Sequence, residues 1–135
     1  MIKKLKKKAK DAATFAYAPY SSIKVGAAIL LKDGRIFSGC NVENVSYGGT
    51  ICAERTAIVK GVSEGLKPGT VQAICLYTKE LWYPCGICLQ FMVEFLEEDT
   101  PIHLISENEE RCLKFKDLFP NGEELLSTYK NLKNN

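Results

Sequence analysis

Two short cysteine motifs are the parts of this 135-residue sequence with the clearest chemical potential. The first is Cys52-Ala53-Glu54, and the second is Pro84-Cys85-Gly86-Ile87-Cys88. Each motif opens a stretch with helical residue spacing, and two thiols three residues apart in a first helical turn can face one point. Backbone N–H groups at the start of a helix favour a thiolate over a thiol. The motifs therefore predict a cluster of metal-binding sulfurs.

Three sulfurs and one carboxylate together predict a catalytic zinc site. Cys52 adds a third sulfur to Cys85 and Cys88 if the two predicted helices pack side by side. Three thiolates around a tetrahedral Zn²⁺ leave one position open, as in catalytic rather than structural zinc sites. Glu54 is close enough to Cys52 in sequence to reach a metal-bound water without being a ligand. An open zinc ion and a poised carboxylate are suited to hydrolysis, so we predict one Zn²⁺ per chain.

Two other interpretations of the cysteines remain open from the residues alone. The segment Cys85-Gly86-Ile87-Cys88 on its own is typical of a redox pair such as that of thioredoxin, but this leaves Cys52 and Glu54 without a role. His103, the sole histidine, could instead complete a closed structural site with the three cysteines. Its place in the apolar run Ile102-His103-Leu104 favours a packing role.

The other three cysteines receive no chemical role. Cys40 and Cys75 lie in apolar, strand-like surroundings and are expected to be small buried hydrophobic residues, whereas Cys112 has no evident partner. The sequence opens Met1-Ile2-Lys3-Lys4-Leu5 and develops no apolar segment of the kind found in secretory signals. We therefore expect a cytoplasmic protein with no disulfide among its six cysteines.

The elements that must position these residues alternate along the chain between strands and helices. Helices are predicted over residues 2–16, 52–62, 86–96 and 123–132, and strands over 23–31, 36–40, 71–78, 102–105 and 112–115. The Asp33-Gly34 pair predicts a tight turn, so the first two strands form an antiparallel hairpin. This alternation implies a single α/β domain over residues 1–135, with three layers in α/β/α order and a mixed five-stranded sheet.

Composition and charge exclude several classes of protein. Hydrophobic residues make up 46% and charged residues 25% of the chain, which excludes a disordered or collagen-like protein. No apolar run approaches the ~20 residues of a membrane span. Six lysines cluster between Lys3 and Lys10, on the outer face of the first predicted helix. A nucleic-acid site would spread basic charge over a face and interleave aromatic residues, so we expect neither nucleic acid nor membrane as a partner.

Further sequence blocks surround the two motifs and carry a resemblance to a known family. In chain order they are Tyr17-Ala18-Pro19-Tyr20-Ser21, Val25-Gly26-Ala27-Ala28, Gly39-Cys40-Asn41-Val42-Glu43-Asn44, Ser46-Tyr47, Ile51-Cys52-Ala53-Glu54-Arg55-Thr56-Ala57, Pro84-Cys85-Gly86, Cys88 and Gln90. Cys-Ala-Glu followed by Pro-Cys-x-x-Cys is the signature of the zinc deaminases in its three-cysteine form. The blocks together resemble the small homotetrameric cytidine deaminases of the cytidine/deoxycytidylate deaminase family, and the resemblance covers residues 17–90.

The resemblance implies a reaction and the residues that perform it. The reaction is hydrolytic deamination of cytidine and 2'-deoxycytidine to uridine and 2'-deoxyuridine with release of ammonia, as part of pyrimidine salvage. Cys52, Cys85 and Cys88 resemble the zinc ligands of the family, and Glu54 resembles the glutamate that shuttles protons between a zinc-activated water and the base. A cytidine deaminase-like fold and a homotetrameric assembly are implied as well.

The resemblance also implies contacts with the nucleoside. Asn41 and Glu43 resemble the pair that holds the ribose hydroxyls, and the backbone of Ala53 is expected to contact the pyrimidine. Tyr47 belongs to a loop that reaches an adjacent subunit's pocket in the family, and it is expected to be a substrate-binding residue.

Arg55 and Gln90 are expected behind the residues that touch zinc or substrate. Arg55 resembles an arginine that hydrogen-bonds a zinc-bound sulfur in the family. Three thiolates on Zn²⁺ carry a net charge of −1, and a neighbouring cation restores the Lewis acidity of the metal.

Three departures from the family pattern affect the base pocket. Leu89 stands where the family usually has Arg, Ile23 where an aromatic residue is common, and Asn121-Gly122-Glu123 supplies no phenylalanine against the base. These departures predict tolerance of small substituents on the base. They also leave open an alternative substrate, blasticidin S or a modified cytidine, which would be deaminated by the same chemistry.

Two alternative functions from other classes also remain open. One is a polynucleotide editor, and the other is a non-enzymatic zinc-stabilised domain.

Overall fold

The computed structural model describes residues 1–133, and its centre is one five-stranded sheet. The strands, in spatial order β2-β1-β3-β4-β5, are β2 (Ile36–Cys40), β1 (Gly26–Leu31), β3 (Val71–Tyr77), β4 (Pro101–Ile105) and β5 (Glu110–Lys114). Only β3 and β4 run parallel, and the other three pairs are antiparallel. The predicted mixed five-stranded sheet is therefore confirmed.

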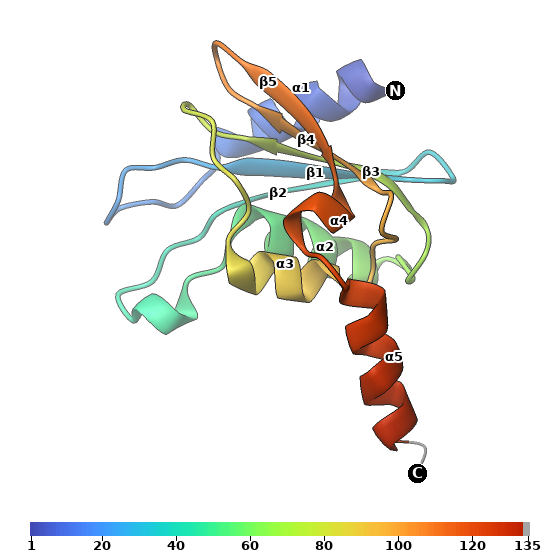
Figure 1. The fold of residues 1–135 in the computed structure, drawn as a ribbon. Coiled ribbons are helices and arrows are strands. Elements are labelled where there is room, and N and C mark those ends of the chain that lie inside the picture. The colour runs from blue at the N-terminus through green and yellow to red at the C-terminus, as the bar shows by residue number, and fades with distance from the viewer. Residues whose placement is uncertain (134–135) are drawn as a thin grey trace.

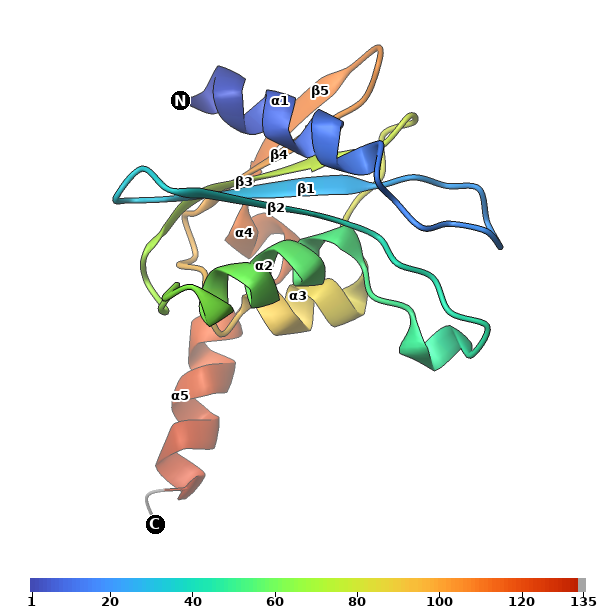
Figure 2. The same cartoon turned by 180° about the vertical axis from the view of Figure 1, so that it is seen from behind.

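The sheet is covered on both faces, which gives the predicted three layers. Helix α1 (Ile2–Ala13) lies on one face, and α2 (Ala53–Ser63) and α3 (Gly86–Met92) lie on the other (Figures 1 and 2). All six residues of β1 are buried, because this central strand has helices above and below it. Parallel pairing of β3 with β4 requires a crossover, and α3 provides it.

Each face of the sheet has its own hydrophobic core. The core beneath α1 is small and is made by Leu5, Ala9, Ala28, Leu30, Ala73, Cys75 and Ile105. The core beneath α2 and α3 is larger and contains Ala53, Ala57 and Ile58 of α2 together with Cys88 and Met92 of α3. The two helices that carry the cysteine motifs therefore pack on the same face, as the zinc prediction requires.

The first helix and the first strand are shorter than the sequence predicts. Helix α1 ends at Ala13 rather than at residue 16, and β1 begins at Gly26 rather than at residue 23. The intervening chain is held by Asn41, whose Oδ1 accepts from the N–H of Val25 at 2.8 Å and whose Nδ2 donates to the carbonyl of Ile23 at 2.8 Å. These bonds to a side chain satisfy the backbone in place of strand pairing.

The other differences lie in the C-terminal half. Helix α3 ends at Met92 rather than at residue 96, because the N–H groups of Phe95 and Leu96 both donate to the Met92 carbonyl and close a turn there. A short helix, α4 (Phe115–Leu118), follows β5 where no helix is predicted, and a 3-10 turn, η1 (Tyr47–Gly49), forms within the predicted loop.

The last helix, α5 (Gly122–Lys133), projects away from the body of the fold (Figure 1). It begins after Asn121, whose φ of 63° turns the chain outward. Of the helices within residues 1–133, none is long and apolar enough to cross a membrane.

Close contact between β1 and α1 makes Gly26 a test of the small core. A Cβ at Gly26 would lie 1.9 Å from the Ala9 carbonyl oxygen and 2.6 Å from the Ala13 nitrogen. We expect Gly26→Ala to lower the free energy of unfolding by at least about 1–3 kcal/mol, because α1 must move away from the sheet. Urea denaturation measures this, with Gly48→Ala as control, since nothing lies within 4 Å of a Cβ there. Equal midpoints for the two variants would contradict the packing.

Candidate active site

Three thiols meet where α2 and α3 begin. Cys52 is the residue directly before α2, Cys85 is the residue directly before α3, and Cys88 lies in the first turn of α3. Their sulfur atoms all lie within 4.8 Å of one another, and the Sγ atoms of Cys52 and Cys85 are 3.8 Å apart. All six cysteines lie in the described part of the chain, and all are free thiols there.

Arg55 places a positive charge beside this cluster. Its Nη2 donates to the Cys52 Sγ at 3.5 Å and to the Thr50 carbonyl at 3.3 Å. Its Nε is buried and has no hydrogen-bond partner within the described residues. The guanidinium therefore lies where it can offset negative charge on the sulfurs, as the family resemblance predicts.

The thiols and the neighbouring carboxyl group do not titrate like free side chains. Hydrogen bonds from Cys88 first, and then from Arg55, lower the pKa of Cys52 to about 5. The Cys88 pKa is raised, because its proton bonds to the Cys52 sulfur and because the side chain is buried. Burial raises the pKa of Glu54 to about 7, with a further contribution from the negative charge of Cys52. Negative charge is therefore favoured on the Cys52 sulfur, which lies next to Arg55.

The donor set suits zinc. Three sulfurs within 4.8 Å can converge on one tetrahedral ion, and the cluster could hold one metal ion. His103 cannot complete it: the side chain shares a sheet face with Cys75, its register partner, and Cys75 belongs to the core beneath α1. The cysteine cluster lies on the opposite face, beside α2 and α3. The closed site with His103 is therefore excluded, and a thiol pair alone does not describe the three-sulfur arrangement.

A cavity of about 310 Å³ opens beside the thiols. Its lining residues are Ser21, Ile23, Val25, Asn41, Glu43, Thr50, Cys52, Ala53, Glu54, Leu76, Thr78, Trp82, Tyr83 and Cys85. Glu54 is 4% exposed, so its carboxyl group is almost fully removed from solvent. The volume lies within the range of small-molecule sites. The structure thus brings Asn41, Glu43, Ala53 and Glu54 to one cavity with two of the three cysteines.

Asn41 and Glu43 also hold the wall of this cavity together. Asn41 bonds the segment around Ile23, as described above. Glu43 accepts from the N–H groups of Tyr20 and Ser21 at 3.0 and 3.1 Å and from the Ser21 hydroxyl at 2.5 Å. These bonds, the one from the Ser21 hydroxyl first, lower the pKa of Glu43. A carboxylate can accept further bonds and an amide can both accept and donate them, so both side chains keep capacity for a ligand.

Four of the predicted site residues do not line the cavity. Cys88 and Arg55 still belong to the thiol cluster. Tyr47 is 84% exposed on η1, and Gln90 is exposed on α3. The lining also includes two aromatic residues that the sequence analysis gives no role, Trp82 and Tyr83, in the loop between β3 and α3. The available signal was their position, directly before Pro84 and the second cysteine motif.

Comparison with known proteins agrees with this geometry. A family described as "Cytidine and deoxycytidylate deaminase zinc-binding region" matches residues 1–104. A cytidine deaminase of Halalkalibacterium halodurans is 48% identical over 98 residues, which are 73% of this chain and 74% of that protein. A cytidine deaminase of Sporosarcina psychrophila is 44% identical over 103 residues, 76% of each chain.

Solved structures match over most of the chain. The crystal structure of cytidine deaminase from Burkholderia pseudomallei has a TM-score of 0.86 and 40% identity, covering 90% of this chain and 98% of that one. The crystal structure of cytidine deaminase from Mycobacterium tuberculosis has a TM-score of 0.75 and 37% identity, covering 89% and 94%.

The fold, the thiol cluster and these likenesses define the class of the protein as a zinc-dependent hydrolytic deaminase. Within that class, the chain belongs to the cytidine and deoxycytidylate deaminase family.

Metal analysis of cysteine variants tests which sulfurs hold the ion. We expect protein purified without added zinc to contain close to one Zn²⁺ per chain and Cys85→Ala to lose it, because two sulfurs hold Zn²⁺ far less tightly than three. Cys112→Ala is the matched control, since this exposed thiol on β5 lies outside the cluster. His103→Ala should also keep its zinc. Zinc retained in Cys85→Ala but lost in His103→Ala would contradict the assignment.

Proposed function

We propose that this chain hydrolyses cytidine and 2'-deoxycytidine to uridine and 2'-deoxyuridine, with release of ammonia, and acts in pyrimidine salvage. The observation that carries the proposal is a single cavity beside the three-thiol cluster, lined by two of its cysteines, a buried carboxyl group and two side chains able to bind sugar hydroxyls. Relatives at 44–48% identity that bear the name cytidine deaminase support it.

The proposed chemistry assigns Cys52, Cys85 and Cys88 to the metal and Glu54 to proton transfer. When bound, zinc supplies a Lewis acid that activates water. Glu54 takes the two protons of the attacking water in turn and delivers the first to N3 of the base and the second to the leaving amine. Its burial keeps bulk water from competing for these transfers. Arg55 offsets the negative charge of the thiolates through its bond to Cys52.

The sugar is proposed to bind through Asn41 and Glu43, and the base to lie against the backbone of Ala53. Both polar side chains are already fixed by bonds to the segment that contains Tyr20 and Ile23, so they present a rigid set of donors and acceptors. Rigid polar groups discriminate strongly between a ligand with a hydroxyl and its analogue without one.

One absorbance assay separates this function from its rivals. Purified protein is mixed in turn with cytidine, 2'-deoxycytidine, blasticidin S and a cytosine-containing oligonucleotide, and the loss of cytosine absorbance is followed. We expect turnover of the two nucleosides and none of the oligonucleotide. Turnover of blasticidin S alone would assign a different substrate, turnover of the oligonucleotide a polynucleotide editor, and no turnover by zinc-loaded protein a non-enzymatic domain.

Removal of the carboxylate should separate chemistry from metal binding. We expect Glu54→Gln to keep its fold and its zinc but to lose turnover of cytidine by about 10²–10⁴-fold or more, because only the proton transfers are removed. Steady-state kinetics and metal content measure the two effects on the same sample. Activity near that of the wild type would refute the role of Glu54.

Comparison of cytidine with free cytosine tests sugar recognition. We expect cytosine to be a very poor substrate, with kcat/KM lower by as much as about 10⁴–10⁵-fold. Glu43→Ala should lower kcat/KM for cytidine far more than for cytosine. Because Glu43 also supports Tyr20 and Ser21, a purely structural loss would reduce both substrates alike. Equal kcat/KM values for cytosine and cytidine in the wild type would show that the enzyme does not recognise the sugar.

A homotetramer is proposed from the family resemblance, and Tyr47 is proposed to reach a neighbouring subunit's site. In a single chain Tyr47 is largely exposed and lies outside the cavity that contains Glu54. We expect light scattering to give about four times the mass of one chain, and Tyr47→Ala to impair turnover. An active monomer would contradict this assembly.

A further inference from the structure

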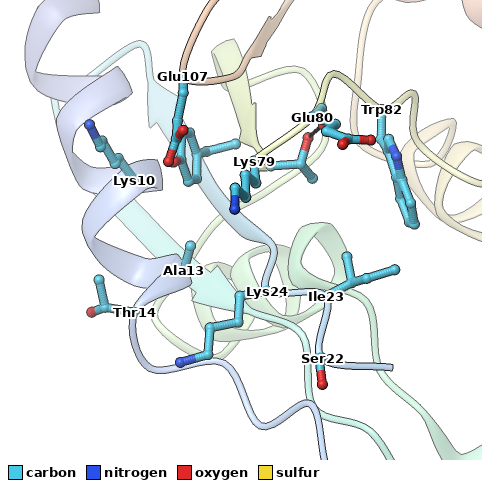
Figure 3. A pocket seen from close by; sticks show the side chains of 12 residues that line it. Lys10, Ala13, Thr14, Ser22, Ile23, Lys24, Lys79, Glu80, Trp82 and Glu107 are labelled. Carbon is cyan, nitrogen blue, oxygen red and sulfur yellow. Dashed lines mark hydrogen bonds between the residues drawn. The ribbon is translucent and has the colours of Figure 1, made fainter. Parts of the chain in front are cut away.

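The candidate active site has a neighbouring cavity, and the two share a boundary. The second cavity, about 580 Å³, lies between the end of α1 and the chain that follows β3. Ile23, Thr78 and Trp82 line both cavities. Figure 3 shows Ile23 and Trp82 on facing segments at one end of the second cavity, with Lys10 and Glu107 at the other end. Trp82 is the largest side chain at the shared boundary.

The loop that carries Trp82 is anchored on both sides of the indole. At its start, the Thr78 N–H donates to the Ile105 carbonyl of β4 at 3.2 Å, and the Thr78 hydroxyl bonds the Glu80 carbonyl. Directly after Trp82, the Tyr83 hydroxyl accepts from Nη1 of Arg111 on β5 at 2.7 Å. The indole is therefore held between fixed points rather than on a free loop.

The indole itself is available to a ligand. Trp82 is 46% exposed, and it lies three residues before Cys85, whose sulfur belongs to the metal cluster. A base whose reacting carbon faces the thiols can therefore lie beside the indole. Stacking of a base on an aromatic side chain corresponds to about 5- to 150-fold in affinity.

We propose that Trp82 is the specificity-determining wall of the base pocket, and that the 580 Å³ cavity behind it is a compartment for substituents carried by the pyrimidine ring. This rests on the proposed function. Trp82 binds the unsubstituted base by stacking and limits the size of the substituents that the wild-type enzyme accepts. Without the indole the two cavities join, and cytidines with a large group on the ring become substrates. The smaller Ile23 on the facing segment leaves Trp82 to set this limit.

Kinetics of Trp82→Ala and Trp82→Phe test the wall. For Trp82→Ala we expect the KM of cytidine to rise about 5- to 150-fold with a smaller change in kcat, because ground-state binding is lost. Trp82→Phe should restore much of the affinity. The wild type should accept 5-methylcytidine and reject 5-phenylcytidine and N4-benzylcytidine, whereas Trp82→Ala should gain activity on at least one of these two. Metal content and circular dichroism confirm that each variant is folded.

Phe15→Ala is the matched control, since Phe15 is an exposed aromatic residue outside both cavities. Phe15→Ala should change neither the KM of cytidine nor the size of the ring substituents that the enzyme accepts. Unchanged KM in Trp82→Ala, or failure to gain either large substrate, overturns the proposal while leaving cytidine turnover by the wild type, and hence the proposed function, intact.

Fluorescence gives a test that does not depend on turnover. Trp82 is the sole tryptophan of the chain, so intrinsic tryptophan emission reports on this residue alone. We expect uridine, the proposed product, to quench or shift the emission with a midpoint equal to its inhibition constant. Emission that stays unchanged at saturating uridine would overturn the placement of the base against Trp82, whether or not the protein turns over cytidine.

Discussion

The site depends on one packing constraint, which is the side-by-side placement of the beginnings of α2 and α3 on one face of the sheet. Residues of the two motifs that are far apart in sequence meet only because both helices pack against the same core. Small residues allow the close approach: a Cβ on Gly39 of β2 would lie 2.5 Å from the nitrogen of Ala57 on α2. A shift of either helix would change the distances between the sulfurs, so the metal site and the larger core form one structural unit.

The packing of the two helices also brings sulfur atoms that can carry negative charge close together. Cys52 is half-buried and Cys88 is buried, and burial of an uncompensated thiolate charge at either position is costly. Hydrogen bonding between the two thiols lowers the pKa of Cys52 and raises that of Cys88. Binding of Zn²⁺ instead allows all three sulfurs to be deprotonated, and Arg55 then offsets the remaining charge. Metal binding and stability of this half of the fold are therefore coupled.

Local sequence patterns predict the beginnings of the helices better than their ends. The cysteine motifs and the helical spacing that follows them mark the beginnings of α2 and α3 to within one residue. The chain after α1 is bound to a distant partner, since the Tyr17 N–H donates to the Asn41 carbonyl at 3.0 Å, whereas α3 ends in a local turn at Met92. A single-sequence pattern does not contain the distant bond, and the helical spacing continues past the local turn.

The candidate site, like the fold, is only partly predictable from the sequence. The thiols and Glu54 follow from residue type and short spacing, Arg55 follows from the family resemblance, and the structure brings them together. The sequence offers only the position of Trp82 before the second cysteine motif, because this residue lies in an irregular loop whose position depends on the bond between Tyr83 and Arg111. The departures at Ile23 and after Pro120 predicted an open base pocket, whereas Trp82 supplies an aromatic surface from a different element.

X-ray absorption at the zinc edge tests the central claim most directly, because it counts the atoms that bind the metal in the intact protein. The account predicts three sulfur atoms at about 2.3 Å and one oxygen atom at about 2.0–2.2 Å, the oxygen occupying the position left open for water. Four sulfur atoms, or three sulfur atoms with an imidazole nitrogen, would show a closed structural site and contradict the account.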